Sequence, residues 1–337
     1  MSPRVSVLLP VRDAGATLDA CLDSLAVQTL ADHEVVAVDD GSTDGSGRVL
    51  AERARGDRRL RVVTTPALGL VSALNRSVAE ARSPLVARMD ADDEAHPERL
   101  VRQVERLERD PGVDVLGSRV EATSEDGRTA SGGMAAYVAW QNGLLDHDAI
   151  RRDRFVESPL VHPSVAMRRA ALVSLAGYRD VDGPEDYELW LRALDAGLRF
   201  AKLADTLVRW RDGPERLTRR DPRYAPARFL AVKLEALERG PLSASRPLVL
   251  WGAGRVGKAW SRALAARGHP LAAFVEVDPG KLGQRIHGVP VIPVDRAASC
   301  QGALHLAAVG QPGARERIRA EAARLGLRDE QDLIAVA

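Results

Sequence analysis

The stretch "LVARMDADDEAHPERL", residues 85–100, raises the first question about this chain. Its apolar beginning is typical of a buried strand, and its end carries a proline-started helical pattern. Between the two lie Asp90, Asp92 and Asp93. Carboxylates this close repel one another and raise each other's pKa unless a positive charge neutralises them. The turn is therefore either fully solvated or a binding site for a cation.

Length and composition describe an ordinary globular protein. The chain has 337 residues, so we expect two domains. Its net charge of +1 gives no reason to expect a nucleic-acid partner. Two cysteines far apart in sequence, Cys21 and Cys300, do not indicate a disulfide framework. No stretch resembles a signal peptide or reaches the roughly 18 apolar residues of a membrane span, which predicts a cytoplasmic protein with at most peripheral membrane contact.

Strand-like and helix-like segments alternate along the first part of the chain. Strands are predicted at residues 5–9, 34–40, 60–65 and 84–89, each followed by an apolar stripe of helical spacing. This order predicts an α/β fold with a mostly parallel central sheet and helices on both faces. From about residue 113 the pattern loosens into expected strands around a polar turn, and no clean period is found as far as residue 155.

The stretch "ERGPLSASRP", residues 238–247, has the composition of a linker. Before it, a helical pattern covers residues 184–196, a strand-like stretch follows, and a helix is expected over residues 227–237. After it the alternation of strand and helix starts again. We therefore predict one domain over residues 1–240 and a smaller one over residues 246–337.

Two acidic turns follow predicted strands of the first domain. Asp39 and Asp40 end one strand, and the Asp90–Asp93 turn follows another. Ligands of open parallel sheets lie beyond the carboxyl ends of the strands, so both turns are expected to face one crevice. An Asp-x-Asp turn suits Mg²⁺ or Mn²⁺, which commonly bridge to phosphates. The alternative is that Asp92 or Asp93 caps the helix that begins near Pro97.

Six motifs in this order resemble family 2 inverting glycosyltransferases of the GT-A fold. The resemblance covers roughly residues 4–212. The motifs are "VSVLLPVRDAGATLDACLDSLAVQT", "EVVAVDDGSTDGS", "GLVSALNRSVAEA", "LVARMDADD", "HPSVAMRRAAL" and "GPEDYELWLRAL". The resemblance implies a metal-dependent enzyme that moves one sugar from a UDP-sugar or another nucleoside diphosphate sugar to a saccharide or lipid-linked acceptor. It also implies a place in surface polysaccharide or glycoconjugate synthesis.

The resemblance also implies a role for particular residues. The implied donor-binding positions are Pro10, Asp39, Asp40, Asn75, Arg88 and Asp90, with His162 also facing the site. The implied metal ligands are Asp90, Asp92 and Asp93, and the implied general base is Asp186, with Glu185 beside it. A carboxylate base fits an in-line displacement that must deprotonate an acceptor hydroxyl. Alternatively, Glu185 and Asp186 stand where they do because acidic residues favour a helix N-terminus.

The sequence departs from the family pattern at two places. Arg12 and Asp13 stand where an aromatic residue and Asn are common, which puts base stacking in doubt. Processive members carry Gln-x-x-Arg-Trp, whereas this chain has Thr206 before Arg209 and Trp210, which favours transfer of a single sugar. Trp210 either forms a platform for a sugar or fills the core.

The second domain contains glycines in G-x-G-x-x-G spacing between a predicted strand and a helix. Gly252, Gly254 and Gly257 lie in "WGAGRVGKAW". Glu276 and Asp278 follow about where a Rossmann fold carries its ribose-binding acid. The stretch "KLGQRIHGVPVIPVD", residues 281–295, further resembles the small Rossmann-like domains attached to sugar-modifying enzymes, a resemblance that covers about residues 246–310. A bound nucleotide or dinucleotide is one explanation of these glycines, and tight packing of strand against helix is the other.

Two rival functions remain open from the sequence. One is an NAD-dependent oxidoreductase that uses the C-terminal glycines, although no Tyr-x-x-x-Lys pair accompanies them. The other is a non-catalytic protein that binds nucleotide sugars. A sugar nucleotidyltransferase is disfavoured because its glycine-rich first loop is missing from "LLPVRDAGAT".

Overall fold

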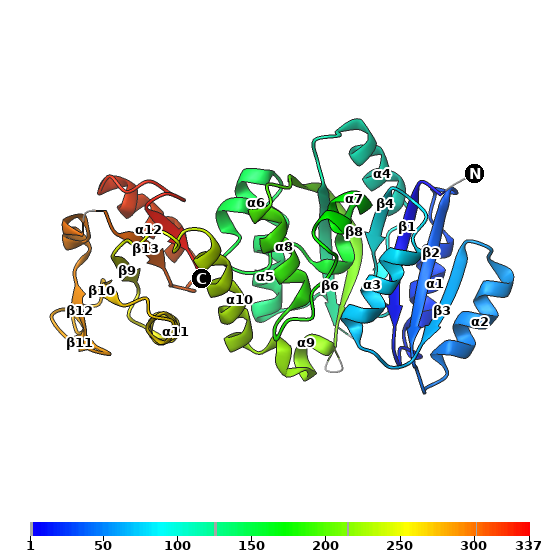
Figure 1. Ribbon diagram of the computed structural model, residues 1–337, viewed down its shortest axis with the longest axis horizontal. Helices are drawn as coiled ribbons and strands as arrows, with labels where there is room; N and C mark the ends of the chain where they lie inside the picture. The colour runs from blue at the N-terminus through cyan, green and yellow to red at the C-terminus, as the bar shows by residue number, and fades with distance from the viewer. Residues whose placement is uncertain (1–2, 125–126, 214–215, 301) are drawn as a thin grey trace. The chain divides into compact units, whose positions relative to one another are not determined.

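The computed structural model describes residues 3–124, 127–213, 216–300 and 302–337. Its internal contacts divide the chain into two compact units, one of residues 1–150 and 159–222, the other of residues 151–158 and 223–337. Each unit has its own sheet (Figure 1). No helix within the described ranges combines the length and the apolarity needed to cross a bilayer.

The first unit is built on an eight-stranded mixed sheet of order β3-β2-β1-β4-β7-β6-β8-β5. Its strands are β1 (Val5–Val11), β2 (His33–Asp40), β3 (Leu60–Thr65), β4 (Leu85–Arg88), β5 (Glu94–Ala95), β6 (Val115–Ser124), β7 (Ala166–Arg168) and β8 (Phe200–Asp212). Strands β3, β2, β1 and β4 are parallel, as predicted, and β7 runs antiparallel to both its neighbours. Parallel pairing brings the carboxyl ends of β2 and β4 to one edge, on either side of β1.

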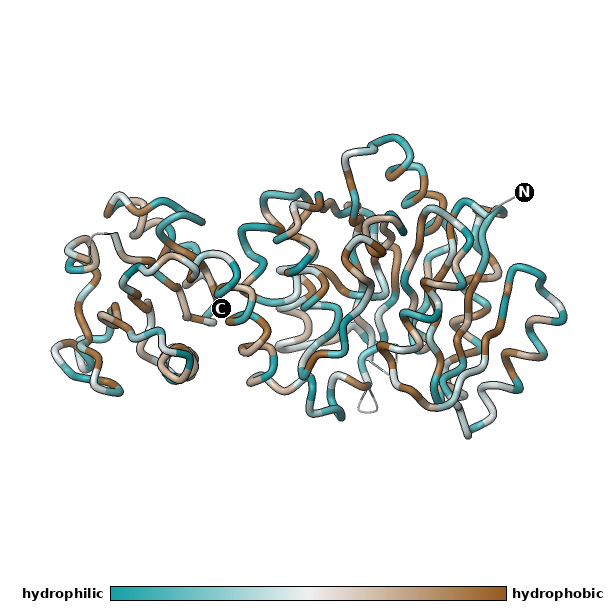
Figure 2. The backbone as a smooth tube through the Cα atoms, in the orientation of Figure 1, coloured by the Kyte–Doolittle hydropathy of each residue, from teal (hydrophilic) through white to brown (hydrophobic). Residues whose placement is uncertain are grey.

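Helices cover both faces of this sheet. They are α1 (Leu18–Ala26), α2 (Ser46–Gly56), α3 (Leu70–Glu80), α4 (Arg99–Arg109), α5 (Gly132–Gly143), α7 (Arg169–Ser174), α8 (Glu185–Asp195) and α9 (Leu217–Arg220), with a 3₁₀ turn, η1 (His162–Ser164). One core packs the apolar stripes of α1 and α4 against the sheet, and a second core packs those of α3 and α8. Hydrophobic residues are correspondingly concentrated along the strands (Figure 2).

The loosely patterned stretch after residue 113 confirms the prediction only in part: Thr123 pairs antiparallel with Thr129 across the polar turn, but a helix rather than a second long strand follows. One long strand, β6, ends at Ser124, and the helix α5 begins at Gly132, with residues 125–126 of the polar turn outside the described part. A further helix, α6 (His147–Asp153), follows. Helix α5 escaped the prediction because it opens with two glycines, which are poor helix formers, and buries only Gln141 completely.

The second unit contains a six-stranded sheet of order β11-β12-β10-β9-β13-β14. Its elements are α10 (Pro226–Arg239), β9 (Leu248–Trp251), α11 (Arg255–Ala266), β10 (Leu271–Val275), β11 (Arg285–Ile286), β12 (Val289–Ile292), β13 (Leu304–Ala307), α12 (Ala314–Arg324) and β14 (Leu333–Ala335), with 3₁₀ turns η2 (Pro222–Tyr224) and η3 (Val294–Ser299). All strands except β11 are parallel. In chain order the five parallel strands stand 3-2-1-4-5, which is part of the doubly wound order.

Helix α10 belongs by its contacts to the second unit, whereas the sequence analysis assigned it to the first domain. Lys233 Nζ donates to the carbonyl of Val156 (2.7 Å). Arg267 forms ion pairs with Glu235 (3.2 Å) and Glu238 (2.8 Å). The linker-like stretch, residues 238–247, lies at the end of α10 and beyond it. Its composition therefore gives no information about which of the two cores the helix packs against. Residues 223–239 therefore pack with the C-terminal sheet.

Candidate active site

The acidic turn lies directly after β4, at the carboxyl edge of the parallel strands. Asp90, Asp92 and Asp93 each offer a carboxylate oxygen, and these oxygens all lie within 4.8 Å of one another. The backbone N–H of Asp93 donates to the carbonyl of Asp90 (3.3 Å) and closes the turn. The structure thus brings the three predicted metal ligands to one point.

Helix α1 supports this turn through the turn's main chain. The hydroxyl of Thr17 donates to the carbonyl of Ala91 (3.0 Å), and the thiol of Cys21 donates to the carbonyl of Asp90 (3.3 Å). Cys21 is fully buried, as its place on the apolar stripe predicted. The carboxylates therefore project from a turn whose backbone is fixed.

The alternative role of these acids as helix caps is wrong. The next helix, α4, begins at Arg99 with Glu98 as its N-cap residue, and no side chain caps it. Strand β5 separates Asp92 and Asp93 from that helix. Capping therefore does not explain why carboxylates are crowded here.

Asp93 carries the most unusual environment in the turn. Its Oδ1 accepts a hydrogen bond from the Arg211 N–H (2.8 Å), while its buried Oδ2 has no hydrogen-bond partner among the described residues. Burial first, and then the charges of Asp92 and Asp90, raise the pKa of Asp93 well above its ordinary value. The pKa of Asp92 is raised for the same two reasons, burial and then Asp90. An additional positive charge would relieve both effects.

Guanidinium groups near the turn neutralise it only in part. Arg88 is buried and pairs directly with Asp90 (2.5 Å). Arg216 lowers the pKa of Asp92 and Asp93, but burial outweighs it in both cases. The three carboxylates, one of which has a buried oxygen without a donor among the described residues, form an oxygen-only ligand set, which suits Mg²⁺ or Mn²⁺. The residues present therefore fit a divalent cation.

Asp39 and Asp40 lie at the end of β2, on the same edge of the sheet. Asp40 is buried and accepts hydrogen bonds from the N–H groups of Leu68 (2.8 Å) and Gly69 (2.9 Å). Asp39 accepts one from the N–H of Ser42 (3.0 Å). Both carboxylates thus fix the loops at this edge of the sheet.

The two residues that depart from the family pattern tie these loops together. Arg12 donates to Asp40 (3.3 Å). Asp13, which has a positive φ of 47°, accepts from the N–H of Thr43 (2.7 Å). The sequence analysis expected these two residues to remove an aromatic side chain on which a base could stack. In the structure they form hydrogen bonds that connect the loop after β1 with the end of β2 and the loop after it.

Glu185 and Asp186 form the first turn of α8. Both therefore occupy the position at which acidic residues favour a helix N-terminus, so the alternative explanation holds as well. Burial first, then the charge of Glu185 and that of Asp90, raise the pKa of Asp186 to about 8. The predicted base and the acidic turn thus lie within electrostatic reach of each other. A carboxylate with this pKa is suited to accept a proton near neutral pH.

His162 lies between the neighbour of the predicted base, Glu185, and Tyr178. His162 lies 3.8 Å from Glu185 through Nδ1, and its Nε2 lies 3.0 Å from the hydroxyl of Tyr178. Burial and the charge of Arg88 lower the pKa of His162 well below its ordinary value, so the ring is neutral. Tyr178 is buried, and burial, the largest effect, raises its pKa, while the charges of Arg88 and Glu185 also reach it. Nothing in the sequence pattern had indicated Tyr178 or Arg216.

Two predicted site residues serve other purposes in the structure. The side-chain amide of Asn75 donates to the carbonyl of Tyr178 (2.8 Å) and accepts from its N–H (2.9 Å), so it holds the chain before α8. Trp210 is only 8% exposed, packs in a cluster with residues of β6, and is covered by the guanidinium of Arg216 at 4.2 Å. Trp210 therefore fills the core. Pro10 is buried within β1, in register with Val38.

The three glycines of the G-x-G-x-x-G motif in the second unit have three different environments. A Cβ on Gly257 would overlap the carbonyl oxygen of Gly252, so close packing of α11 on β9 requires glycine there. Gly252 has a positive φ of 100° and also lies against Val309. A Cβ on Gly254 would meet no atom within 4 Å. Packing explains two of the three glycines, and only Gly254 leaves room.

Glu276, the predicted ribose-binding acid, is already fully engaged. One of its oxygens accepts from the N–H of Ala253 (3.0 Å) and from Lys281 Nζ (3.2 Å). The other accepts from the N–H groups of Val277 (2.9 Å) and Asp278 (3.3 Å). These bonds lower the pKa of Glu276 even though burial acts to raise it. A ribose diol would have to displace protein donors, so the residues present do not fit a dinucleotide in the usual way.

Three known proteins resemble the chain over most of its length. The amylovoran biosynthesis glycosyltransferase AmsE of Erwinia amylovora is 31% identical over 218 residues, 64% of this chain and 79% of that protein. The UDP-Gal:alpha-D-GlcNAc-diphosphoundecaprenol beta-1,3-galactosyltransferase of Escherichia coli is 27% identical over 65% of this chain and 78% of its own. The mannosyltransferase PcManGT of Pyrobaculum calidifontis, solved with GDP-Man and Mn²⁺, superposes with a TM-score of 0.52 at 21% identity, over 73% of this chain and 66% of that one.

The model of the family "Glycosyl transferase family 2" matches residues 6–175. The matched range contains both acidic turns, and the first unit has the GT-A type of fold. The chain belongs to glycosyl transferase family 2.

Proposed function

We propose that the first unit is a metal-dependent, inverting glycosyltransferase that transfers one sugar from a nucleoside diphosphate sugar to a saccharide or lipid-linked acceptor. The observation that carries the proposal is the grouping of the carboxylate oxygens of Asp90, Asp92 and Asp93 within 4.8 Å of one another, with Oδ2 of Asp93 buried and unpartnered among the described residues. A cation site together with a carboxylate base is what a single displacement at an anomeric carbon requires. The relatives named for amylovoran biosynthesis and for a diphosphoundecaprenol acceptor support polysaccharide synthesis.

In the proposed reaction, Asp186 accepts the proton of an acceptor hydroxyl. The freed oxygen forms a bond to the anomeric carbon as the bond from that carbon to the diphosphate breaks, which inverts the configuration. Asp90, Asp92 and Asp93 would hold Mg²⁺ or Mn²⁺, which would supply positive charge for the departing diphosphate. Glu185 and Asp90 keep the pKa of Asp186 high enough for it to act as a base.

The second unit is given no redox role in this proposal. Glu276 has four protein donors, and Gly252 and Gly257 are explained by backbone geometry and packing. These contacts disfavour the NAD-dependent oxidoreductase. We also propose a cytoplasmic location, with peripheral contact at the membrane where a lipid-linked acceptor would be presented.

The test is a screen of nucleotide sugars for hydrolysis by the full chain, with Mg²⁺, with Mn²⁺ and with EDTA. We expect release of nucleoside diphosphate that EDTA abolishes and that Asp92→Asn lowers at least ~100-fold, on the scale of losing one electrostatic contact to the transition state. NMR of the transferred sugar would establish the configuration. Hydrolysis that is insensitive to EDTA would contradict the proposal, and tight donor binding without any turnover would favour the non-catalytic alternative.

A further inference from the structure

The loop after β1 and the acidic turn after β4 flank the point at which the strand order of the first unit reverses. From β1 the chain proceeds outward to β2 and β3, and it then returns to β4 on the other side of β1. Ligands of open α/β sheets bind outside the carboxyl ends of the strands at such a switch point. Arg12 follows β1 directly, and Asp90 follows β4 within two residues. A nucleotide whose diphosphate lies at the acidic turn is therefore bordered by the loop of Arg12.

Asp40, at the end of β2, has no acceptor site left for the base of such a nucleotide. Its Oδ1 accepts from the N–H of Leu68 (2.8 Å) and from the hydroxyl of Thr65 (3.4 Å). Its Oδ2 accepts from the N–H of Gly69 (2.9 Å) and from Arg12 (3.3 Å). Because a carboxylate oxygen offers about two acceptor sites, these four donors occupy all of them. The side chain is also only 4% exposed, so an N–H group of a base would have to displace a protein donor.

Asp39 faces the other side of β2, because successive side chains of a strand point to opposite faces of the sheet. Its Oδ1 accepts from the N–H of Ser42 (3.0 Å). Its Oδ2 lies 2.6 Å from the place that a Cβ on Gly47 would take, against the first turn of α2. Neither acid of this pair is therefore placed to accept a hydrogen bond from a base.

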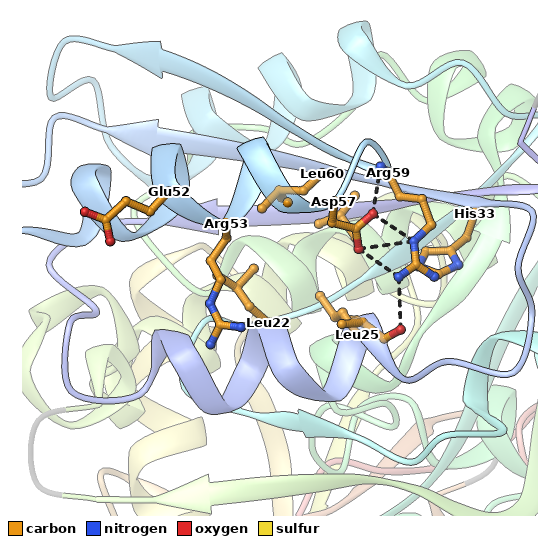
Figure 3. A pocket seen from close by; sticks show the side chains of 11 residues that line it. Leu22, Leu25, His33, Glu52, Arg53, Asp57, Arg59 and Leu60 are labelled. Atoms are coloured by element: carbon orange, nitrogen blue, oxygen red, sulfur yellow. Dashed lines mark hydrogen bonds and ion pairs between the residues drawn. The ribbon is translucent and has the colours of Figure 1, made fainter.

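Arg12 supplies the hydrogen-bond donors that this edge of the sheet leaves unused. Its Nη1 donates to Asp40, and within the described ranges its guanidinium makes no other hydrogen bond or ion pair. The side chain is 51% exposed, so the N–H groups of Nε and Nη2 are open to a ligand. Arg59, at the amino-terminal end of the strands, differs, because Asp57 occupies both its Nε (2.9 Å) and its Nη2 (2.7 Å) (Figure 3). Asp40 thus orients a guanidinium whose outer fork is free.

We propose that Arg12 binds the base of the donor and selects guanine, so that the donor is a GDP-sugar. A guanidinium fork donates two parallel hydrogen bonds, and guanine offers the neighbouring acceptors O6 and N7 on one edge. Adenine places an amino group beside N7, and uracil places an N–H between its two carbonyl oxygens. That N–H would need the acceptor that Asp40 no longer has. The inference rests on the proposed function, because it requires the diphosphate to lie at the acidic turn.

The test is isothermal titration of the full chain in Mg²⁺ with GDP, inosine diphosphate, 7-deaza-GDP and UDP. Inosine diphosphate keeps O6 and N7 and lacks only the 2-amino group, whereas 7-deaza-GDP lacks N7. We expect GDP and inosine diphosphate to bind within twofold of each other. Both 7-deaza-GDP and UDP should bind about tenfold more weakly or worse, on the scale of one hydrogen bond to a charged group.

The outcomes distinguish this inference from the proposed function. Equal affinity for GDP and 7-deaza-GDP, or binding of UDP as tight as that of GDP, would overturn the selection of guanine. The proposed transfer would still stand if nucleotide sugars were hydrolysed in an EDTA-sensitive way. No binding of any of the four compounds would contradict both.

Two variants at position 12 separate the fork from the charge. Arg12→Met removes both, and Arg12→Lys keeps the charge but cannot donate through a planar fork. Each should bring the affinities for GDP and UDP within twofold of each other. Arg58→Met, at an exposed position before β3, is the matched control and should keep the preference of the parent chain. A preference for GDP that survives in Arg12→Lys would contradict the role of the fork. If neither variant folds, the four nucleotides still decide the question on the parent chain.

Discussion

Each unit of the chain has acidic side chains shortly after a parallel strand. The two units differ in whether the protein supplies hydrogen-bond donors to those carboxylates. In the first unit Asp93 is buried with one oxygen unpartnered among the described residues, and its pKa is raised well above its ordinary value. In the second unit Glu276 accepts four hydrogen bonds from its own surroundings, and its pKa is lowered. The unsatisfied carboxylate of Asp93 is thus open to a ligand, whereas the satisfied carboxylate of Glu276 holds the surrounding loop together.

The largest effect should come from Asp186→Asn. The variant removes the proposed base while it keeps the shape of the side chain and the bond from the N–H of Tyr187. Because general-base catalysis contributes ~10²–10⁴-fold, we expect transfer to fall by about that factor while donor binding is retained. Steady-state rates with a defined acceptor measure the loss. Asp32→Asn, an exposed control at the other edge of the sheet, should be fully active, and a variant at position 186 with more than a tenth of the parent rate would contradict the assignment.

The pH dependence of transfer should give the next largest effect. Asp186 must be ionised to accept a proton, so kcat/KM should rise about tenfold per pH unit below its pKa and then level off. Its pKa of about 8 depends in part on the charge of Asp90. Mg²⁺ at the turn would neutralise that charge, so the midpoint of the profile at saturating Mg²⁺ should lie below 8. A rate that falls as the pH rises from 5 to 8 would exclude Asp186 as the base.

A pair of glycine variants sharpens the comparison in the second unit. Gly257→Ala forces a methyl group against the carbonyl of Gly252 and should lower the free energy of unfolding of this unit by about 1–3 kcal/mol. Gly254→Ala adds its methyl to open space at a negative φ of −85° and should change it by less than ~0.5 kcal/mol. Hydrogen exchange in peptides of β9 and α11 measures both. If Gly254→Ala instead weakened binding of NADH, the second unit would be a ligand site after all.

The smallest expected effect is a gain in stability. Asp93→Asn removes a buried charge and keeps an oxygen for the N–H of Arg211. We expect the metal-free protein to gain about 1 kcal/mol in the free energy of unfolding, because a buried carboxylate without full pairing is costly. The added stabilisation by Mg²⁺ should shrink in the same variant. Thermal unfolding in EDTA and in Mg²⁺ measures both changes, and a variant that is less stable in EDTA would show that Asp93 needs no ligand.

Sequence patterns predicted the parts of the fold that repeat a simple period. The strands around "EVVAVDD" and "PLVARM" and their helices follow from apolar spacing, and their parallel pairing brings both acidic turns to one edge. Helix α5 was missed because it has almost no buried apolar stripe. Helix α10 was assigned to the first domain because the sequence of a helix does not show which neighbouring helices it contacts.

Only some features of the candidate site could likewise be predicted from the sequence. The ligand types at Asp90, Asp92 and Asp93 follow from spacing, and the structure groups them. The roles of Asn75 and Trp210 depend on what lies opposite them in space, which no spacing along the chain encodes. The same is true of Tyr178, which meets His162 only after η1 and the segment before α8 have packed.

Helix α1 joins the core of the first unit to the acidic turn. Its residues Leu22 and Leu25 are buried in that core, while Thr17 and Cys21 donate to the carbonyl groups of Ala91 and Asp90. A substitution in the core that displaces this nine-residue helix would therefore also displace the backbone of the turn. Packing far from the carboxylates thus bears on how closely their oxygens can approach one another.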